Sequence, residues 1–480
     1  MTLLTDSALS LARKIRSRET TSREVIEAHI KRISALHVTL NALVVDRFSA
    51  ARAEADAADR ALADGGVELG PLHGVPISVK ECVGLEGMPQ TVGMVSRIGQ
   101  VAPRDATAVS RLRAAGAIPL GLTNVPELAM WMETSNRVYG RTNNPYDPRR
   151  IVGGSSGGEG ALIGSGGSPL GIGSDIGGSI RMPAFFNGIF GHKPSAGLVP
   201  NTGHWPQSHG AAKRYLTTGP MCRRAEDLWP ALTLMAGPDG EDDACGPISL
   251  GDPKDVSLAG LTVYDVTSSG LFHIDDELQA AQRAVADHLA SLGARIIPFS
   301  HAGFRSAFHI WSALMTTAAK TSFSEILGEG TEIPLLRSLY DLARGRSAHT
   351  LPALALVLAE RVMPIFPGET RAVDLARELK TDLDLILDDH AVLLYPSYPD
   401  QAPLHDHPLR SPLKWQYAAI WNVLELPVTQ APLGLSQRGL PLGLQLVAGH
   451  GRDRICVAVA TELERKFGGW VPPPDSLSER

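Results

Sequence analysis

The stretch GGSSGGEGALIGSGGSPLGIGSDIGGSIR, from Gly153 to Arg181, is the most informative part of the sequence. It carries twelve glycines in the 26 residues from Gly153 to Gly178. Each glycine costs roughly 0.5–1 kcal/mol of backbone entropy relative to alanine in a regular element, so this density indicates unusual dihedral angles or close backbone contacts. A flexible linker would not be interleaved with leucines and isoleucines as this stretch is. We therefore expect a shaped turn that presents its serines.

Glycine-rich turns of this kind serve several chemistries. Their exposed N–H groups can bind phosphate or stabilise an oxyanion. Phosphate binding has little support, because the stretch has no GxxxxGK[ST] motif and its glycines do not fall as GxGxxG after a strand. Residues 153–157 match the GxSxG nucleophile elbow, but that interpretation needs a strand before Ser155 and a later Asp and His. The nucleophile-elbow interpretation of Ser155 therefore stays open.

A second arrangement uses two serines and a lysine. Ser179 follows two glycines, so the turn can direct four backbone N–H groups at an oxyanion: those of Ile176, Gly177, Gly178 and Ser179. A serine hydroxyl needs a base, and lysine acts as one only where burial lowers its pKa towards neutrality. The run GVPISVK, residues 74–80, has the pattern of a short strand and ends on Lys80. Lys80 is therefore the candidate base.

Helical and strand patterns alternate on both sides of this stretch. Residues 105–115 have helical spacing, and an apolar strand pattern follows them. Strand patterns return at 261–266, 294–298 and 391–395, with a helical pattern at 276–292 between them. Near the amino terminus, Thr21 and Glu24 have capping-box spacing before an amphipathic helical pattern. The sequence therefore predicts an α/β fold with a large mixed β-sheet covered by helices on both faces.

We expect one domain over residues 1–480, although a chain of this length also allows two. Its parts would be an amino-terminal helical region (about 1–65), a core around the glycine-rich stretch (about 66–235) and a carboxy-terminal part (about 256–480). The acidic, Gly/Pro-rich stretch 237–255 is typical of a surface loop between the last two. The Leu-rich pattern from Pro334 to Pro367 favours a packed helical pair, with a lid or a membrane-contacting face as alternatives.

Composition narrows the function classes. A net charge of -6 with 44% hydrophobic and 20% charged residues is ordinary for a soluble globular protein, and such a chain lacks the basic surface that nucleic acid requires. The four cysteines lie far apart without a CxxC pair, which suits a reducing cytoplasm better than a disulfide framework. The first residues lack the features of a signal peptide, and no window approaches the roughly 18 apolar residues of a membrane span. We expect a cytoplasmic protein without a membrane span.

The motif text resembles the amidase signature family. The resemblance rests on GVPISVKE around Lys80 and on the glycine-rich stretch, in which Ser179 lies 24 positions after Ser155. DATAVSRLRAAGAIPLGLTN and the carboxy-terminal GLPLGLQLVAGHGRDRICVAVATELE are similar to further family segments, so most of the chain is covered. The segments MWMETSNRVYGRTNNPYD and MPAFFNGIFGHKPS are most similar to the fatty acid amide hydrolase branch. A soluble, bacterial-like member without that branch's amino-terminal membrane segment is expected.

This resemblance implies the amidase signature fold and an amide-cleaving hydrolase with a Ser-cisSer-Lys triad. Ser179 would attack the carbonyl and form an acyl-enzyme. Ser155, after a cis peptide bond, would pass the proton to Lys80 as general base. The family implies no cofactor and no metal.

The resemblance also implies supporting and binding residues. Ser156, Asp175 and Arg181 would hold the turn, with ordinary structural contacts as the alternative. The carbonyl of Ala129 and the side chains of Met130 and Met132 would line the acyl pocket, with plain core packing as the alternative.

The substrate would be a small-molecule amide, ester or carbamate, and a homodimer stays open. Rival interpretations are a subunit of a glutamine-dependent amidotransferase, a catalytically silent scaffold, and an α/β-hydrolase-type esterase. The esterase would use Ser155 and one of the 15 histidines, such as His192, His309 or His450. A metal-dependent amidase would rely on His405 to His407, but neighbouring side chains point to opposite faces of a strand.

Overall fold

The computed structural model describes residues 2–65, 68–318, 321–362 and 369–474. Eleven strands form one sheet in the order β1-β3-β2-β6-β8-β7-β12-β13-β11-β9-β10, and β4 and β5 form a separate pair. The large sheet is mixed, because β3-β2-β6 and β11-β9-β10 pair in parallel and the remaining neighbours are antiparallel. The predicted α/β fold with a large mixed sheet is confirmed.

The strands are β1 (Leu43–Asp46), β2 (Pro76–Lys80), β3 (Ile118–Thr123), β4 (Ser135–Asn136), β5 (Gly140–Arg141), β6 (Leu170–Asp175), β7 (Phe190–Lys193), β8 (Thr217–Cys222), β9 (Thr262–Asp265), β10 (Arg295–Pro298), β11 (Ala391–Pro396), β12 (Val428–Leu435) and β13 (Pro441–Val447). The helices are α1 (Ala8–Arg16), α2 (Ser22–Leu40), α3 (Phe48–Asp64), α4 (Thr107–Ala114), α5 (Gly157–Gly164), α6 (Arg181–Phe186), α7 (Ala212–Tyr215), α8 (Leu228–Met235), α9 (Asp276–Ser291), α10 (Ala302–Arg305), α11 (Ala307–Ala318), α12 (Phe323–Leu327), α13 (Leu335–Ala343), α14 (Leu351–Val362), α15 (Glu369–Ile386), α16 (Gln416–Val423) and α17 (Asp453–Phe467).

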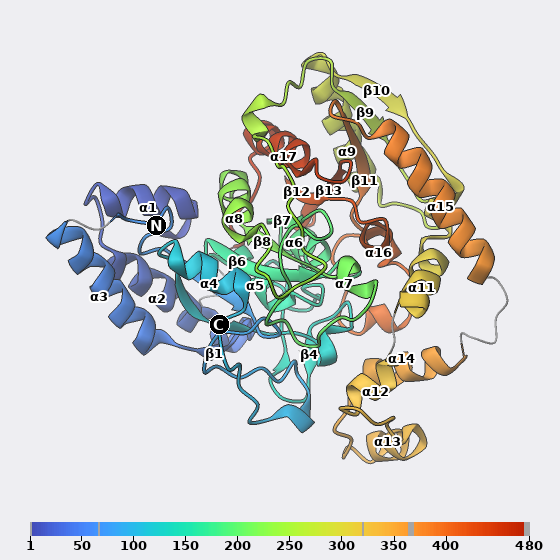
Figure 1. Ribbon diagram of the computed structural model, residues 1–480, viewed down its shortest axis with the longest axis horizontal. Coiled ribbons are helices and arrows are strands. Elements are labelled where there is room, and N and C mark those ends of the chain that lie inside the picture. The colour runs from blue at the N-terminus through green and yellow to red at the C-terminus, as the bar shows by residue number, and fades with distance from the viewer. Residues whose placement is uncertain (1, 66–67, 319–320, 363–368, 475–480) are drawn as a thin grey trace.

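Alternating side chains of the strands divide the core into two layers. In β2, Ile77 and Val79 pack into a cluster with residues of α1, α4, α8 and α17. Ser78 and Lys80 therefore point to the opposite face, where α5 and α6 lie near the centre of the sheet (Figure 1). On that same face, β11 packs against α6, α11, α15 and α16 through Leu393 and Tyr395. The alternation thus decides that Lys80 faces α5 and α6.

Local sequence signals correspond closely to the elements observed. Thr21 is the N-cap of α2, and its capping box with Glu24 is complete. The strand predicted at residues 74–80 is β2, and Lys80 is its last residue. The helix predicted at 276–292 is α9, between the predicted strands β9 and β10.

The Leu-rich segment from Pro334 folds as the helices α13 and α14. Their inner faces form a small core with Leu128 and Met94, so the predicted packed pair is present in the described residues. Their outer faces expose apolar side chains, including Leu336 at 83% and Tyr340 at 59%. Residues 363–367 of this segment lie outside the described residues.

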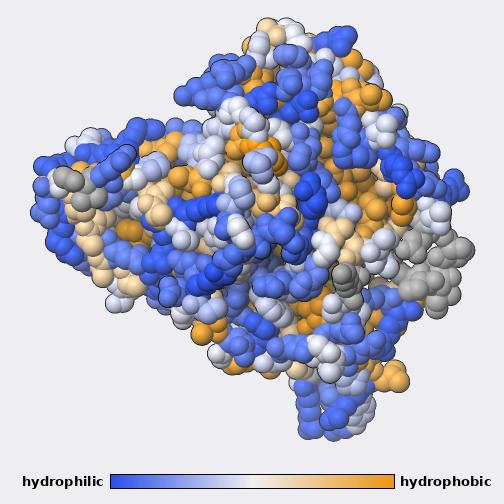
Figure 2. Space-filling view, viewed as in Figure 1, coloured by the Kyte–Doolittle hydropathy of each residue, from blue (hydrophilic) through white to orange (hydrophobic). Residues whose placement is uncertain are grey.

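Most of the molecular face seen in Figure 2 is hydrophilic, and apolar residues gather over α11 and α15 at the right of the view. Of the helices in the described ranges, none has both the length and the apolar character to cross a membrane.

Candidate active site

The two serines of the glycine-rich stretch meet at one place. Ser155 directly precedes α5, and Ser179 lies in the turn between β6 and α6. The backbone N–H of Ser156 donates to the Ser179 carbonyl at 3.1 Å, and the Gly154–Ser155 peptide bond is cis. From residue 151 to residue 196, all residues are buried except Ile176, Gly177 and Ser179. Solvent therefore reaches this region at the Ser179 turn.

Lys80 lies beneath this turn and is fully buried. Its Nζ contacts the Ser155 hydroxyl at 2.8 Å, the Ser174 hydroxyl at 3.0 Å and the Ser174 carbonyl at 3.2 Å. Burial lowers the pKa of Lys80 from its ordinary value, opposed by the charges of Cys82 and nearby carboxylates. Sequence reasoning missed Ser174, although this residue lies in the glycine-rich stretch directly before Asp175. Lys80 thus has both the contact and the lowered pKa that a base for serine chemistry needs.

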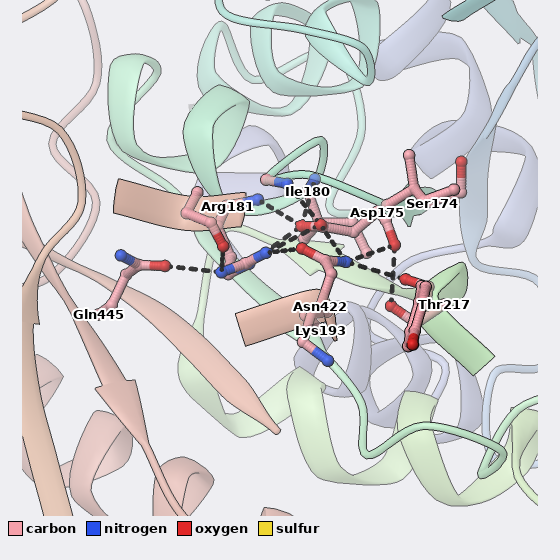
Figure 3. A network of polar contacts seen from close by, with 12 residues as sticks. Ser174, Asp175, Ile180, Arg181, Lys193, Thr217, Asn422 and Gln445 are labelled. Carbon is pink, nitrogen blue, oxygen red and sulfur yellow. Dashed lines mark hydrogen bonds and ion pairs between the residues drawn. The ribbon is translucent and has the colours of Figure 1, made fainter. Parts of the chain in front are cut away.

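A buried ion pair holds the turn that carries Ser179 (Figure 3). Arg181 binds Asp175 through two nitrogens, at 3.0 and 2.9 Å, and neither side chain is exposed. The Asp175 carboxylate also accepts from the N–H groups of Gly178 and Ile180 at 2.7 and 2.9 Å. Burial alone would raise the pKa of Asp175, but the guanidinium and the Ile180 N–H lower it well below its usual range. The pair therefore fixes the backbone on both sides of Ser179.

Residues from distant segments complete this network. Asn422 on α16 donates to the Asp175 carbonyl at 2.9 Å and accepts from Arg181 at 2.7 Å. Gln445 on β13 accepts from Arg181 at 2.8 Å (Figure 3). Sequence reasoning missed both residues, because no motif links them to the glycine-rich stretch.

We expect Arg181→Met to lower the free energy of unfolding by about 3–5 kcal/mol, because it leaves the buried Asp175 carboxylate unpaired. Arg149→Met is the matched control, since Arg149 binds Asp147 through two nitrogens but is 80% exposed. This exposed pair should contribute little to stability, because solvent and salt screen it. Urea unfolding of both variants measures the difference, and equal losses would contradict the role given to the buried pair.

The predicted oxyanion donors divide into two groups. The Gly178 N–H already donates to Asp175, so it is engaged in holding the turn. Among the described residues, no hydrogen bond occupies the N–H groups of Ile176, Gly177 or Ser179. The Ser156 hydroxyl bonds to the backbone of Ser174 at 3.3 and 3.4 Å instead of reaching the turn. Three of the four predicted donors are thus free in the resting turn.

The three residues predicted to bind substrate lie in different surroundings. Ala129 and Met130 are partly exposed, and Ala129 has a positive φ of 53° in a tight turn. Met132 is only 4% exposed and packs in the core beside α6. The segment approaches Ser155 through its backbone, since a β-carbon on Gly154 would lie 2.2 Å from the Trp131 carbonyl oxygen. The packing of Met132 is that of a core residue.

Half-buried aromatic side chains cover the Ser179 turn. The Trp311 indole N–H donates to the Ile176 carbonyl at 2.9 Å. Trp415 stands so close to Gly177 that a β-carbon there would be 3.2 Å from it. The rings of Trp311 and Trp415 pack edge to face with their centroids 4.8 Å apart, and the ring centroids of Phe308 and Trp415 are 6.2 Å apart. Sequence reasoning missed this aromatic cluster of Phe308, Trp311 and Trp415, which gives the exposed turn an apolar wall.

The esterase and metal-dependent alternatives both need a suitably placed histidine, and among the described residues no histidine side chain is hydrogen-bonded to Ser155. Its side-chain partner among the described residues is Lys80, and no strand directly precedes it as an elbow requires. His192 is fully buried and binds Thr429 and Asp453. His405 binds Glu133 and a backbone carbonyl through its two nitrogens. The described residues contain no group of His, Cys, Asp and Glu arranged to hold a metal ion.

Comparison with known proteins identifies the family of the chain. The model of the Amidase family matches residues 24–457. Fatty-acid amide hydrolase 2-A of Danio rerio is 45% identical, covering 98% of this chain and 90% of that protein, and fatty-acid amide hydrolase 2 of Homo sapiens is 43% identical, covering 98% and 91%. The solved structure of 6-aminohexanoate cyclic dimer hydrolase complexed with substrate has a TM-score of 0.80 at 25% identity and covers 99% of both chains. The chain therefore belongs to the Amidase family, has the amidase signature fold, and is a hydrolase that cleaves amide bonds.

Proposed function

We propose that the chain hydrolyses amides of apolar acyl groups through Ser179 as nucleophile, Ser155 as proton bridge and Lys80 as base. One observation carries the proposal: the fully buried Lys80 Nζ lies 2.8 Å from the Ser155 hydroxyl, and Ser155 adjoins the partly exposed Ser179 turn. Ser155 is itself only 2% exposed, which suits a bridge better than a nucleophile that must meet substrate.

The reaction would proceed in two half-reactions. The Ser179 hydroxyl attacks the amide carbonyl while its proton passes to Ser155 and the Ser155 proton passes to neutral Lys80. The free N–H groups of the turn stabilise the oxyanion. The proton returns through the same bridge to the leaving nitrogen, the C–N bond breaks, and an acyl-enzyme remains. In the second half-reaction water attacks the acyl carbonyl and passes a proton through Ser155 to Lys80. The proton then returns to the Ser179 oxygen, the ester bond breaks, and the acid is released.

The aromatic cluster supports an apolar acyl group as the substrate. Trp311, Trp415 and Phe308 wall the approach to Ser179, and the most similar relatives named above are fatty-acid amide hydrolases. The same acyl-enzyme chemistry extends the proposal to esters and carbamates of similar shape. Ala129 and Met130, which are partly exposed, are proposed to line the pocket, while Met132 would act through packing.

An acyl-length series of p-nitroanilides tests the substrate class. We expect kcat/KM to rise about fourfold for each added methylene from butanoyl to decanoyl, since burying a methylene is worth about 0.8 kcal/mol. Trp415→Ala should flatten this slope. Trp229→Ala, which alters a half-buried tryptophan packed in the core on the other face of the sheet, should preserve it. A flat series in the unaltered protein would contradict the apolar acyl pocket.

The amidotransferase interpretation makes a different prediction, because such a subunit would need partner subunits and glutamine. Anilide turnover by the purified chain alone, with no glutaminase activity, is the result that we expect. Within the same proposal the protein acts in the cytoplasm, supported by its free cysteines Cys82, Cys222, Cys245 and Cys456. Sedimentation of the purified chain distinguishes a monomer from a homodimer.

A further inference from the structure

His204 lies beside the catalytic lysine although it comes from a separate loop. An antiparallel bridge between Val83 and His204 joins this loop to the segment after β2. It is formed by two backbone hydrogen bonds: the Gly84 N–H donates to the Gly203 carbonyl at 3.0 Å, and the Trp205 N–H donates to the Cys82 carbonyl at 2.9 Å. His204 is only 6% exposed. Its imidazole is thus held at the end of the strand that carries Lys80.

The hydrogen bonds of His204 determine its tautomer. Nδ1 lies 3.1 Å from the Pro206 carbonyl oxygen, which can only accept, so Nδ1 carries the proton of the neutral ring. Nε2 is then an acceptor, and the Ser174 hydroxyl lies 2.9 Å from it. Cys82 Sγ lies 3.3 Å from the same nitrogen. Burial raises the pKa of Cys82 and the charge of Lys80 is the main cause that lowers it, so with Lys80 neutral Cys82 keeps its thiol proton, and a hydroxyl is then the stronger hydrogen-bond donor. The Ser174 hydroxyl therefore donates to His204.

This direction decides what Ser174 offers to Lys80. With its proton turned to His204, the Ser174 hydroxyl oxygen can only accept from Lys80, as the Ser174 carbonyl does. A neutral lysine has two N–H groups and one lone pair. The two Ser174 acceptors take both N–H groups, which leaves the lone pair facing the Ser155 hydroxyl at 2.8 Å. Neutral Lys80 is thereby oriented as a base towards Ser155.

We propose that His204 is a positioning residue for the reaction: acting through Ser174, it aims the lone pair of Lys80 at Ser155. Without an acceptor at Nε2, the Ser174 proton would turn to the Lys80 lone pair and compete with Ser155. The charged or titratable groups acting on Lys80 are Cys82, Asp175 and Glu159. Of these, Cys82 also contacts the Ser174 hydroxyl, but its Sγ lies 3.7 Å away whereas His204 Nε2 lies at 2.9 Å, so the imidazole is the nearer acceptor of the Ser174 proton. This inference rests on the proposed role of Lys80 as base.

Two substitutions at His204 separate hydrogen bonding from packing. In His204→Gln the side-chain amide oxygen can take the place of Nε2 and accept from Ser174. In His204→Asn the shorter amide can reach the Pro206 carbonyl but leaves Ser174 without its acceptor. With decanoyl p-nitroanilide we expect His204→Asn to lower kcat about tenfold with KM unchanged, and His204→Gln to stay within about threefold of the unaltered protein.

His73→Asn is the matched control, because His73 is 7% exposed, bonds to a backbone carbonyl through one nitrogen, and lies before the opposite end of β2. Its kcat should not change. Ser174→Ala provides a second test that does not require the His204 variants to fold: it should lower kcat with KM unchanged, and adding His204→Asn to it should cost nothing more.

An unchanged kcat in His204→Asn or in Ser174→Ala would overturn the inference, and so would equal losses in His204→Asn and His204→Gln. Independent addition of the Ser174 and His204 losses would also overturn it. These results are distinguishable from a failure of the proposed function. If the proposed function were wrong, the unaltered protein would not cleave the anilide at all.

Discussion

Ser179→Ala is expected to reduce amide turnover by roughly 10⁴-fold or more, because it removes the atom that forms the acyl-enzyme. The fold should be intact. Among the described residues no hydrogen bond involves the Ser179 hydroxyl, and the turn is held by Asp175 and Arg181 instead. Steady-state kinetics with decanoyl p-nitroanilide and thermal unfolding measure the two properties on one preparation.

Ser165→Ala is the matched control for this substitution. Ser165 is a buried serine of the same glycine-rich stretch, and its hydroxyl donates to the Leu162 carbonyl at the far end of α5. Its loss should leave turnover unchanged. Normal turnover in Ser179→Ala would exclude Ser179 as the nucleophile.

Lys80→Ala is expected to lower kcat on amides by about 10²–10⁴-fold, the usual contribution of a positioned acid–base group. The loss should be smaller on the p-nitrophenyl ester of the same acid, because phenolate leaves without a proton whereas an amine does not. Burial lowers the pKa of Lys80 and the base must be neutral, so activity of the unaltered protein should rise with pH through that pKa. The variant should lose this rise.

Lys193→Met is the matched control, because Lys193 is also fully buried and burial lowers its pKa to about 7. Its Nζ donates to the Pro194 carbonyl, not to either serine. The control should keep the rise of activity with pH. If Lys80→Ala kept the rise of activity with pH, or if Lys193→Met lost it, the assignment of Lys80 as the base would be contradicted.

The features that the sequence predicted well depend on neighbouring residues. The capping box of Thr21 and Glu24 and the strand that ends on Lys80 follow from local pattern, and both are present. The site near Ser155 and Ser179 was recognisable because both serines lie in one glycine-rich stretch. Such signals need no knowledge of which strands pair.

The features that sequence reasoning missed depend on contacts between distant segments. Ser174 contacts Lys80 because β6 pairs with β2, and Asn422 reaches Asp175 across 247 positions of the chain. For Met132 the sequence left the acyl pocket and plain core packing open, because the irregular segment around it follows no period; the side chain is 4% exposed and packs beside α6.

The most direct measurement is mass spectrometry of the protein after reaction with a fluorophosphonate, with the adduct mapped to a single residue and anilide turnover assayed in parallel. We predict one adduct, on Ser179, with complete loss of turnover and no adduct in Ser179→Ala. An adduct on Ser155 would contradict the assignment of nucleophile and bridge, and the absence of any adduct would contradict serine catalysis by this chain.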